Sequence, residues 1–184
     1  GGLRRGAVYL FHTCSSCFHK QGRCFRLKGY EISEGSRTSR GTNIVNLLSM
    51  DSDEKVTALI KVTPDEYERE DRCLVMVTRK GIIKRTPLGA YKNVRRMGLI
   101  AIGLDDGDEL AWVRQTDGTS ELIIATKNGM AIRFDEQDAR PLSRTARGVK
   151  AITLEDGDEV VGMARVRKES GATLLTVSES GLGR

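Results

Sequence analysis

The chain has 184 residues, of which 39% are hydrophobic and 30% are charged, and its formal net charge is +5. This composition is typical of an ordinary folded protein and excludes an intrinsically disordered one. The longest apolar run, residues 99–104, is far shorter than the roughly 18 residues that a membrane span needs, so we predict no membrane partner.

Residues 1–16 form an atypical N-terminal segment that does not match the sequence that follows. The cluster His12, Cys14, Cys17 and His19 contains side chains of the types that bind zinc. Eight consecutive residues can hardly surround one ion, so we interpret them as ordinary strand residues, while zinc binding remains an open alternative. The four cysteines come without a secretory signal, which indicates reduced thiols in a cytosolic protein.

A hairpin signature recurs along the rest of the chain: an apolar strand, a polar turn with a glycine, and a second strand that ends in basic residues. The turn glycines are Gly22, Gly81, Gly129 and Gly181, at intervals of about 50 residues. Asn128-Gly129 in particular supplies the positive φ that tight hairpin turns require.

Two further motifs follow each complete hairpin in the same order. A basic turn that enters a strand occurs at 36–47, 93–104 and 143–154, and an acidic turn and strand occur at 53–56, 107–110 and 157–160. Residues 63–72 are rich in charge and contain Pro64, so we interpret them as an exposed connection with room for one helical turn.

Each repeat therefore consists of a hairpin, a basic loop, a strand, an acidic turn and a final strand. Four strands in roughly 50 residues is the size of a propeller blade. We predict an all-β, propeller-like fold built from repeated four-stranded blades of roughly 50 residues. Residues 1–184 form one repeat domain, an incomplete propeller of about three to four blades. The predicted blades are 17–66, 73–117 and 121–167, with the start of a further blade at 173–184.

Basic residues return at matching points in each repeat, which favours contact with a phosphate backbone over ordinary solvated loop charges. Arginine suits phosphate because its planar fork can bind two oxygens. Acidic residues gather elsewhere, so we expect one basic and one acidic side. Aromatic residues do not interleave with the basic ones, which favours duplex over single-stranded DNA. The candidate DNA-binding residues are Arg23, Arg26, Lys28, Arg37, Arg40, Lys84, Arg85, Arg95, Arg96, Arg133, Arg144, Arg147 and Lys150.

The sequence over about residues 17–184 resembles the C-terminal domain of the bacterial DNA gyrase A subunit. The segments that carry the resemblance are 22–32, 36–48, 80–86, 128–134 and 144–148. It implies a six-bladed β-pinwheel whose basic outer rim wraps double-stranded DNA. It also implies a cytoplasmic, chromosome-associated protein that works with the rest of the A subunit and with the B subunit in ATP-dependent negative supercoiling.

One departure from the family concerns its wrapping motif, Gln-Arg-Arg-Gly-Gly-x-Gly. Residues 1–6 of this chain, Gly-Gly-Leu-Arg-Arg-Gly, contain some of the same residues but in a different order. Two alternatives therefore remain: the corresponding domain of topoisomerase IV, which would wrap DNA less, and a propeller used as a protein-interaction scaffold.

No catalytic residue and no cofactor are expected in this chain. No Gly-Lys dipeptide occurs, which excludes a phosphate-binding P-loop, and only two histidines are available for a hydrolytic triad. None of the four tyrosines follows an arginine, as the cleaving tyrosine of gyrases does in a different domain.

Overall fold

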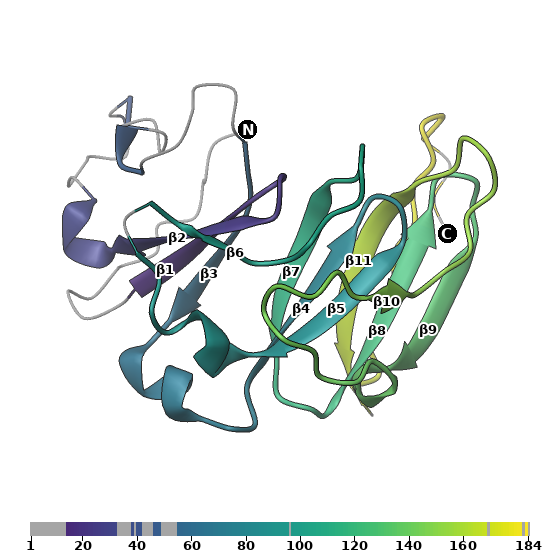
Figure 1. Cartoon of the computed structure of the whole chain (residues 1–184). Helices are drawn as coiled ribbons and strands as arrows, with labels where there is room; N and C mark the ends of the chain where they lie inside the picture. The colour runs from purple at the N-terminus through teal and green to yellow at the C-terminus, as the bar shows by residue number, and fades with distance from the viewer. Residues whose placement is uncertain are drawn as a thin grey trace.

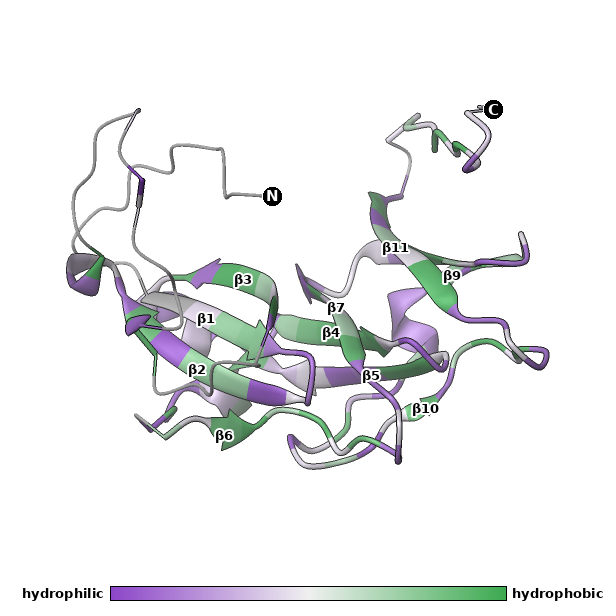
Figure 2. Cartoon of the chain, turned by 90° about the horizontal axis from the view of Figure 1, so that it is seen from above, coloured by the Kyte–Doolittle hydropathy of each residue, from purple (hydrophilic) through white to green (hydrophobic). Residues whose placement is uncertain are grey.

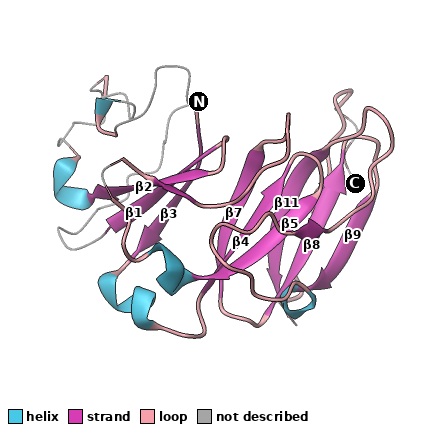
Figure 3. Cartoon of the chain, in the orientation of Figure 1, coloured by secondary structure: helices cyan, strands magenta, loops and turns pink. Residues whose placement is uncertain are grey.

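The structure is a computed structural model that describes residues 14–32, 38, 40–41, 46–48, 55–95, 97–168, 170–181 and 183. Antiparallel strands joined by turns and short 3-10 helices make up this part of the chain, as Figure 3 shows. The predicted all-β class is confirmed.

The elements follow the order expected from the repeat. The strands are β1 (Cys14–His19), β2 (Arg23–Lys28), β3 (Val56–Val62), β4 (Cys73–Thr78), β5 (Ile82–Pro87), β6 (Leu99–Ile100), β7 (Leu110–Thr116), β8 (Ser120–Thr126), β9 (Ala131–Asp135), β10 (Val149–Lys150) and β11 (Val160–Arg167). The 3-10 helices are η1 (Gly29–Glu31), η3 (Pro64–Glu68), η4 (Leu88–Tyr91) and η5 (Glu136–Asp138).

Consecutive strands form the three predicted hairpins, β1–β2, β4–β5 and β8–β9. Their turn glycines, Gly22, Gly81 and Gly129, have φ values of 77°, 81° and 87°. The first strand of each hairpin also pairs with the strand after the acidic turn, namely β3, β7 or β11. Each of these pairings shifts register once near the turn, and such a bulge increases the local twist of the sheet.

The sheets do not coincide with the blades predicted along the chain. Their strand orders are β3-β1-β2-β6, β10-β5-β4-β7 and β11-β8-β9. Strand β6 belongs to the second repeat but completes the first sheet, and β10 of the third repeat completes the second sheet. The expectation that each repeat builds its own four-stranded blade is therefore wrong, because the fourth strand comes from the following repeat.

The three sheets stand in a row along the chain (Figure 1), and Figure 2 shows β6 and β10 on one side of the row and β3, β7 and β11 on the other. The edge formed by β6, β10 and the loops that precede them is called the β6/β10 edge below.

The core lies between neighbouring sheets. Strand β4 is buried on both faces: Leu74 and Met76 pack toward the first sheet, whereas Val75 and Val77 pack toward the third. Strand β8 alternates between buried and half-buried residues, as a strand covered on one face does. The second sheet is thus the centre of the described structure.

Two predicted segments need comment. The connection 63–72 contains η3 as its helical turn, but Tyr67 within it is only 6% exposed, so the connection is partly buried rather than simply exposed. In the predicted start of a further blade, 173–184, Gly181 donates to the Ser178 carbonyl at 2.9 Å, and the described residues there are exposed.

Candidate nucleic-acid interface

The basic loops that precede β6 and β10 lie directly on the hairpin of the preceding repeat. Each ends in a glycine with positive φ, Gly98 at 77° and Gly148 at 110°. A Cβ added at Gly98 would meet Phe25 Cε1 at 2.7 Å, and one added at Gly148 would meet the Ile83 carbonyl oxygen at 2.5 Å. Only glycine leaves room for these contacts. The close approach of each loop to the hairpin fixes the position of the loop's basic side chains.

The loop 143–148 carries two of the predicted arginines. The half-buried Arg144 donates from Nη1 to the Ile100 carbonyl. Arg147 pairs with Asp105 at 2.7 Å, and its side chain remains 59% exposed. Both guanidinium groups therefore contact the second repeat, while that of Arg147 also faces solvent.

The predicted separation of charge into a basic and an acidic side is wrong at the junctions between repeats. The acidic turn 105–109 contacts the third repeat through the Arg147–Asp105 pair and the first repeat through a Lys20–Glu109 pair of 3.1 Å. Exposed pairs of this kind contribute little stability, about 0–1 kcal/mol. They moderate the positive potential beside the basic loops.

Four more predicted residues are exposed. These are Lys28, Arg40, Arg95 and Lys150. Arg95 lies in the loop before β6, and Lys150 lies in β10 itself. Two predicted residues, Arg37 and Arg96, lie outside the described residues.

The Arg23 side chain packs against the loop before β6 instead of projecting from the surface. Its half-buried guanidinium lies over the Phe25 ring, 5.0 Å from the centroid, and donates to the Met97 carbonyl of the loop before β6. Arg23 thus connects the first sheet to the second repeat.

Arg26, Arg85 and Arg133 occupy the same position when the hairpin glycines are aligned. Arg26 donates to the Tyr91 carbonyl at 3.2 Å, and Arg85 donates to the Ala139 carbonyl at 2.8 Å. Tyr91 and Ala139 in turn occupy matching positions in the following repeats. The recurring arginine therefore links one repeat to the 3-10 turn of the next.

The prediction that Lys84 and Arg85 contact DNA is wrong, because β10, η5 and the 143–148 loop cover both side chains. Lys84 is 0% exposed and Arg85 is 4% exposed, and Arg85 lies 3.9 Å from the fully buried carboxylate of Glu136. Burial, with a smaller contribution from Arg144, lowers the pKa of Lys84 to about 7. Neither side chain can reach a phosphate.

Arg133 differs from its two counterparts. Its guanidinium pairs with Glu121 on the neighbouring strand β8, and its side chain is 62% exposed. Arg140 was missed by the sequence analysis and is also exposed, in the segment between η5 and the 143–148 loop. Repeated spacing could not select Arg140 because it stands outside the recurring motifs.

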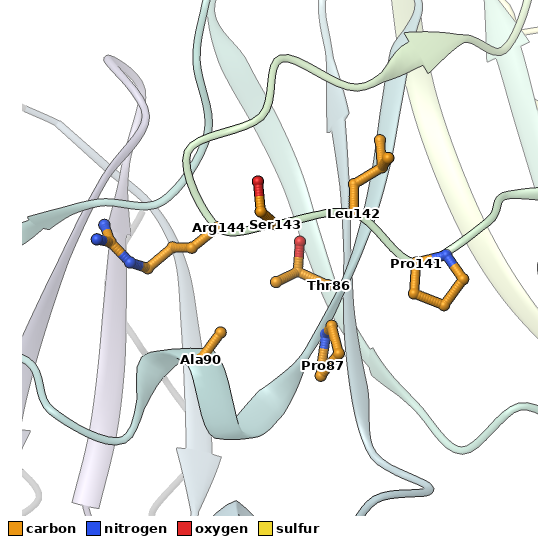
Figure 4. Close-up of a pocket in the computed structure, with 7 residues that line it drawn as sticks. All are labelled: Thr86, Pro87, Ala90, Pro141, Leu142, Ser143 and Arg144. Carbon is orange, nitrogen blue, oxygen red and sulfur yellow. The ribbon is translucent and has the colours of Figure 1, made fainter.

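A hollow of about 370 Å³ lies beside Arg144, where the second and third repeats meet (Figure 4). It is lined by Thr86, Pro87, Ala90, Pro141, Leu142, Ser143 and Arg144. Arg144 is the single charged residue of this lining, and its guanidinium is bound to the Ile100 carbonyl. The hollow therefore does not have the character of an anion site.

Two members of the candidate zinc cluster can be placed. Cys17 lies in an apolar cluster with a free thiol, and burial raises its pKa to about 12. Both ring nitrogens of the buried His19 face backbone N–H groups, at 3.1 and 2.9 Å. His12 lies outside the described residues. Among the residues that are described, no three His, Cys, Asp or Glu side chains gather as a metal site would need.

No helix in the described part of the chain has the length and apolar character needed to cross a bilayer.

One protein family, described as "DNA gyrase C-terminal domain, beta-propeller", matches residues 20–63, 74–117 and 120–167. These segments cover well over half of the chain. The chain belongs to the DNA gyrase C-terminal domain family. The resemblance inferred from the sequence and the propeller-like β-pinwheel fold are thereby confirmed.

Curated relatives of this DNA gyrase C-terminal domain are A subunits of DNA gyrase. The chain is 44% identical over 168 residues to that of Haloquadratum walsbyi, and 42% identical over 167 residues to that of Staphylococcus aureus. Each match covers 91% of this chain but only 20% or 19% of the relative. The chain thus spans about a fifth of the length of these relatives.

Two solved structures share the fold of this gyrase-family domain. The C-terminal domain of DNA topoisomerase IV superposes with a TM-score of 0.79 at 29% identity, over 86% of this chain and 49% of that one. A DNA gyrase A C-terminal domain superposes with a TM-score of 0.74 at 24% identity, over 100% of this chain and 59% of that one.

Proposed function

We propose that this chain binds duplex DNA through its phosphate backbone, as part of the C-terminal domain of a gyrase A subunit. The observation that carries the proposal is the repetition of exposed cations, Arg95, Arg147 and Lys150, along the β6/β10 edge. Cations repeated from one sheet to the next can follow a curved duplex and replace its counterions. Membership of the family supports the same function.

In the whole enzyme, this binding wraps DNA so that an ATP-dependent type II topoisomerase introduces negative supercoils. The partners are double-stranded DNA, the rest of the A subunit and the B subunit, in the cytoplasm at the chromosome. The chain itself contributes no catalytic residue and needs no cofactor. Its work is to hold and bend DNA.

The primary test is the salt dependence of binding to a mixed-sequence duplex of about 40 base pairs. If about six phosphates are neutralised, log affinity falls with log salt at a slope near −5. A flat salt response, or no binding at low salt, overturns the proposal. Because no base readout is proposed, duplexes of different sequence should bind equally well.

A matched pair of variants locates the interface. Replacing Arg95 and Arg147 by alanine should reduce the magnitude of the salt slope by roughly 2, one unit for each lost phosphate contact. Arg114→Ala is the control, since Arg114 is also exposed but lies on β7 at the opposite end of the second sheet. An equal effect of the control would place the DNA elsewhere.

A topoisomerase IV subunit is the second candidate, favoured by the likeness to the C-terminal domain of that enzyme. The two candidates differ in how far they wrap DNA. Ligating nicked circles in the presence of the complete A subunit measures wrapping as a change in linking number. A large change of one sign supports gyrase, whereas binding with little change supports topoisomerase IV.

A further inference from the structure

Lys84 is a charged residue at a position that is apolar in the other repeats. With the hairpin glycines aligned, its counterparts are Phe25 in β2 and Ile132 in β9. Lys84 is nevertheless completely buried in β5. A buried ammonium is retained only where oxygen atoms replace its water, so its surroundings indicate what it does.

Three backbone carbonyls surround the Lys84 ammonium. Nζ donates to Ala101 and Arg144, and the Ser143 oxygen lies at 3.4 Å. An ammonium has three N–H donors and no acceptor, so this cage uses its full capacity. Ala101 follows β6 in the same repeat as Lys84, whereas Ser143 and Arg144 open the basic loop of the following repeat. Lys84 thus connects a sheet to the next basic loop.

The two described basic loops are held differently. The loop before β6 rests on the apolar Phe25 ring through Gly98 and accepts a hydrogen bond at the Met97 carbonyl from Arg23, which is a neighbour of that ring on the same strand. The loop 143–148 rests on β5 through Gly148 and is bound in addition by the Lys84 ammonium. Its other attachments are a hydrogen bond from Gly103 N–H to the Ala146 carbonyl, at 3.1 Å, and the side chains of its own two arginines.

We propose that Lys84 is a positioning residue for DNA binding: its ammonium fixes the backbone at Ser143 and Arg144, and this orients Arg144 and Arg147 on the β6/β10 edge. The inference rests on the proposed function, because Arg147 is one of the cations taken to contact DNA, and Arg144 belongs to the loop that holds it. Lys84 itself touches no phosphate, so its effect must pass through the loop.

A double-mutant cycle on the whole chain, measured at about pH 6, below the Lys84 pKa of about 7, so that Lys84 is an ammonium, separates this role from a direct contact. Lys84→Met should weaken duplex binding by roughly fivefold, but it should change binding by less than about twofold when Arg144 and Arg147 are already alanine. Lys80→Met is the matched control: Lys80 is exposed in the turn of the same hairpin, so it removes equal charge and should act alike in both backgrounds. An equal loss from Lys84→Met in both backgrounds, or no loss in the first, overturns the proposal.

Amide hydrogen exchange tests the positioning without DNA. In Lys84→Met, the Ala146 amide, which donates to the Ser143 carbonyl at 3.2 Å, and the Gly103 amide, which donates to the Ala146 carbonyl at 3.1 Å, should exchange at least roughly tenfold faster than in the wild type, while β8 keeps its protection. If Lys84→Met does not fold, Lys84→Gln replaces it in both experiments, because its amide retains two donors and should give intermediate effects. Unchanged exchange at Ala146 and Gly103 refutes the positioning. Faster exchange at these two amides, together with no DNA binding by the wild type, refutes the proposed function alone.

Discussion

The β4–β5 and β8–β9 hairpins have matching sequences but different surroundings. All six residues of β4 are buried, and so are all residues of β5 except Pro87, whereas no residue of β9 is buried. The second hairpin is covered by β10, η5 and the 143–148 loop of the repeat that follows. No described segment pairs with the outer edge of β9. Burial in this array is therefore decided by the following repeat and not by the hairpin itself.

The largest expected effect comes from a charge placed in the two hairpins at Val75 and Ile123, which occupy matching positions. Val75 is fully buried and Ile123 is half-buried. An unpaired buried carboxylate costs several kcal/mol, comparable with the whole stability of a domain. Val75→Asp should therefore abolish cooperative unfolding in urea followed by circular dichroism, and Ile123→Asp should keep it. An equal loss of stability in both variants would mean that the third sheet is buried to the same extent as the second.

The next effect concerns the recurring arginine. Arg85→Ala leaves the Glu136 carboxylate buried without its cation, which costs about 3–5 kcal/mol. Arg133→Ala removes an exposed pair with Glu121 and should cost less than about 1 kcal/mol. Chemical denaturation of both variants measures the difference. A large loss at Arg133 would show that a further partner covers it.

A smaller difference is expected at the turn glycines. Alanine at Gly81 or Gly129 must adopt positive φ, at a cost of about 1–2 kcal/mol. At Gly81 the new Cβ also lies 3.0 Å from the Ile152 carbonyl oxygen, whereas at Gly129 nothing lies within 4 Å. Gly81→Ala should therefore lose roughly 1 kcal/mol more in guanidinium titrations than Gly129→Ala. Equal losses would contradict the close approach at Gly81.

A last difference between the two hairpins is a pH dependence of stability that is present in β5 and absent from β9. The pKa of Lys84 is lowered from 10.5 to about 7, so between these values the unfolded chain binds the additional proton and stability rises with pH. Between about pH 6.5 and about pH 8.5 the wild type should gain roughly 1–2 kcal/mol. Lys84→Met should lack this gain in denaturation measured at both pH values.

The upper limit of that pH window is set by the buried thiols. The pKa values of Cys17 and Cys24 are raised from 9.0 to about 12, so above about pH 8.5 the unfolded chain loses protons first and stability falls. If the stability of the wild type and that of Lys84→Met change equally with pH below this limit, the lowered pKa of Lys84 is contradicted.

The sequence allowed the order of elements to be predicted but not their pairing. Glycines with flanking apolar residues define a hairpin locally, and Gly22, Gly81 and Gly129 stand in the predicted turns. The hydrogen-bond partners of β6 and β10 lie in the preceding repeat, and no local pattern specifies a partner so far along the chain. The blades were therefore assigned their fourth strand from the wrong repeat.

The candidate site was predicted in part for a similar reason. Arg95 and Arg147 are exposed in loops, as expected from basic turns. Lys84 and Arg85 have the same residue types but lie under the following repeat. A basic residue at a recurring position indicates a recurring partner, and it does not distinguish a phosphate from a backbone carbonyl of the neighbour. Aligning the glycines was the one signal that could have identified Arg26 and Arg85 as links between repeats.

Strands β6 and β10 each complete the sheet of the preceding repeat, so the two ends of the row of repeats are not equivalent. In a linear chain of repeats, stability is a sum of terms for each unit and for each junction, and here the junction term includes a shared backbone ladder. Unfolding the third repeat removes a strand from the second sheet, whereas unfolding the first repeat leaves the second sheet with all four of its strands. Fraying from the C-terminal side should therefore spread to the neighbouring repeat more readily than fraying from the N-terminal side.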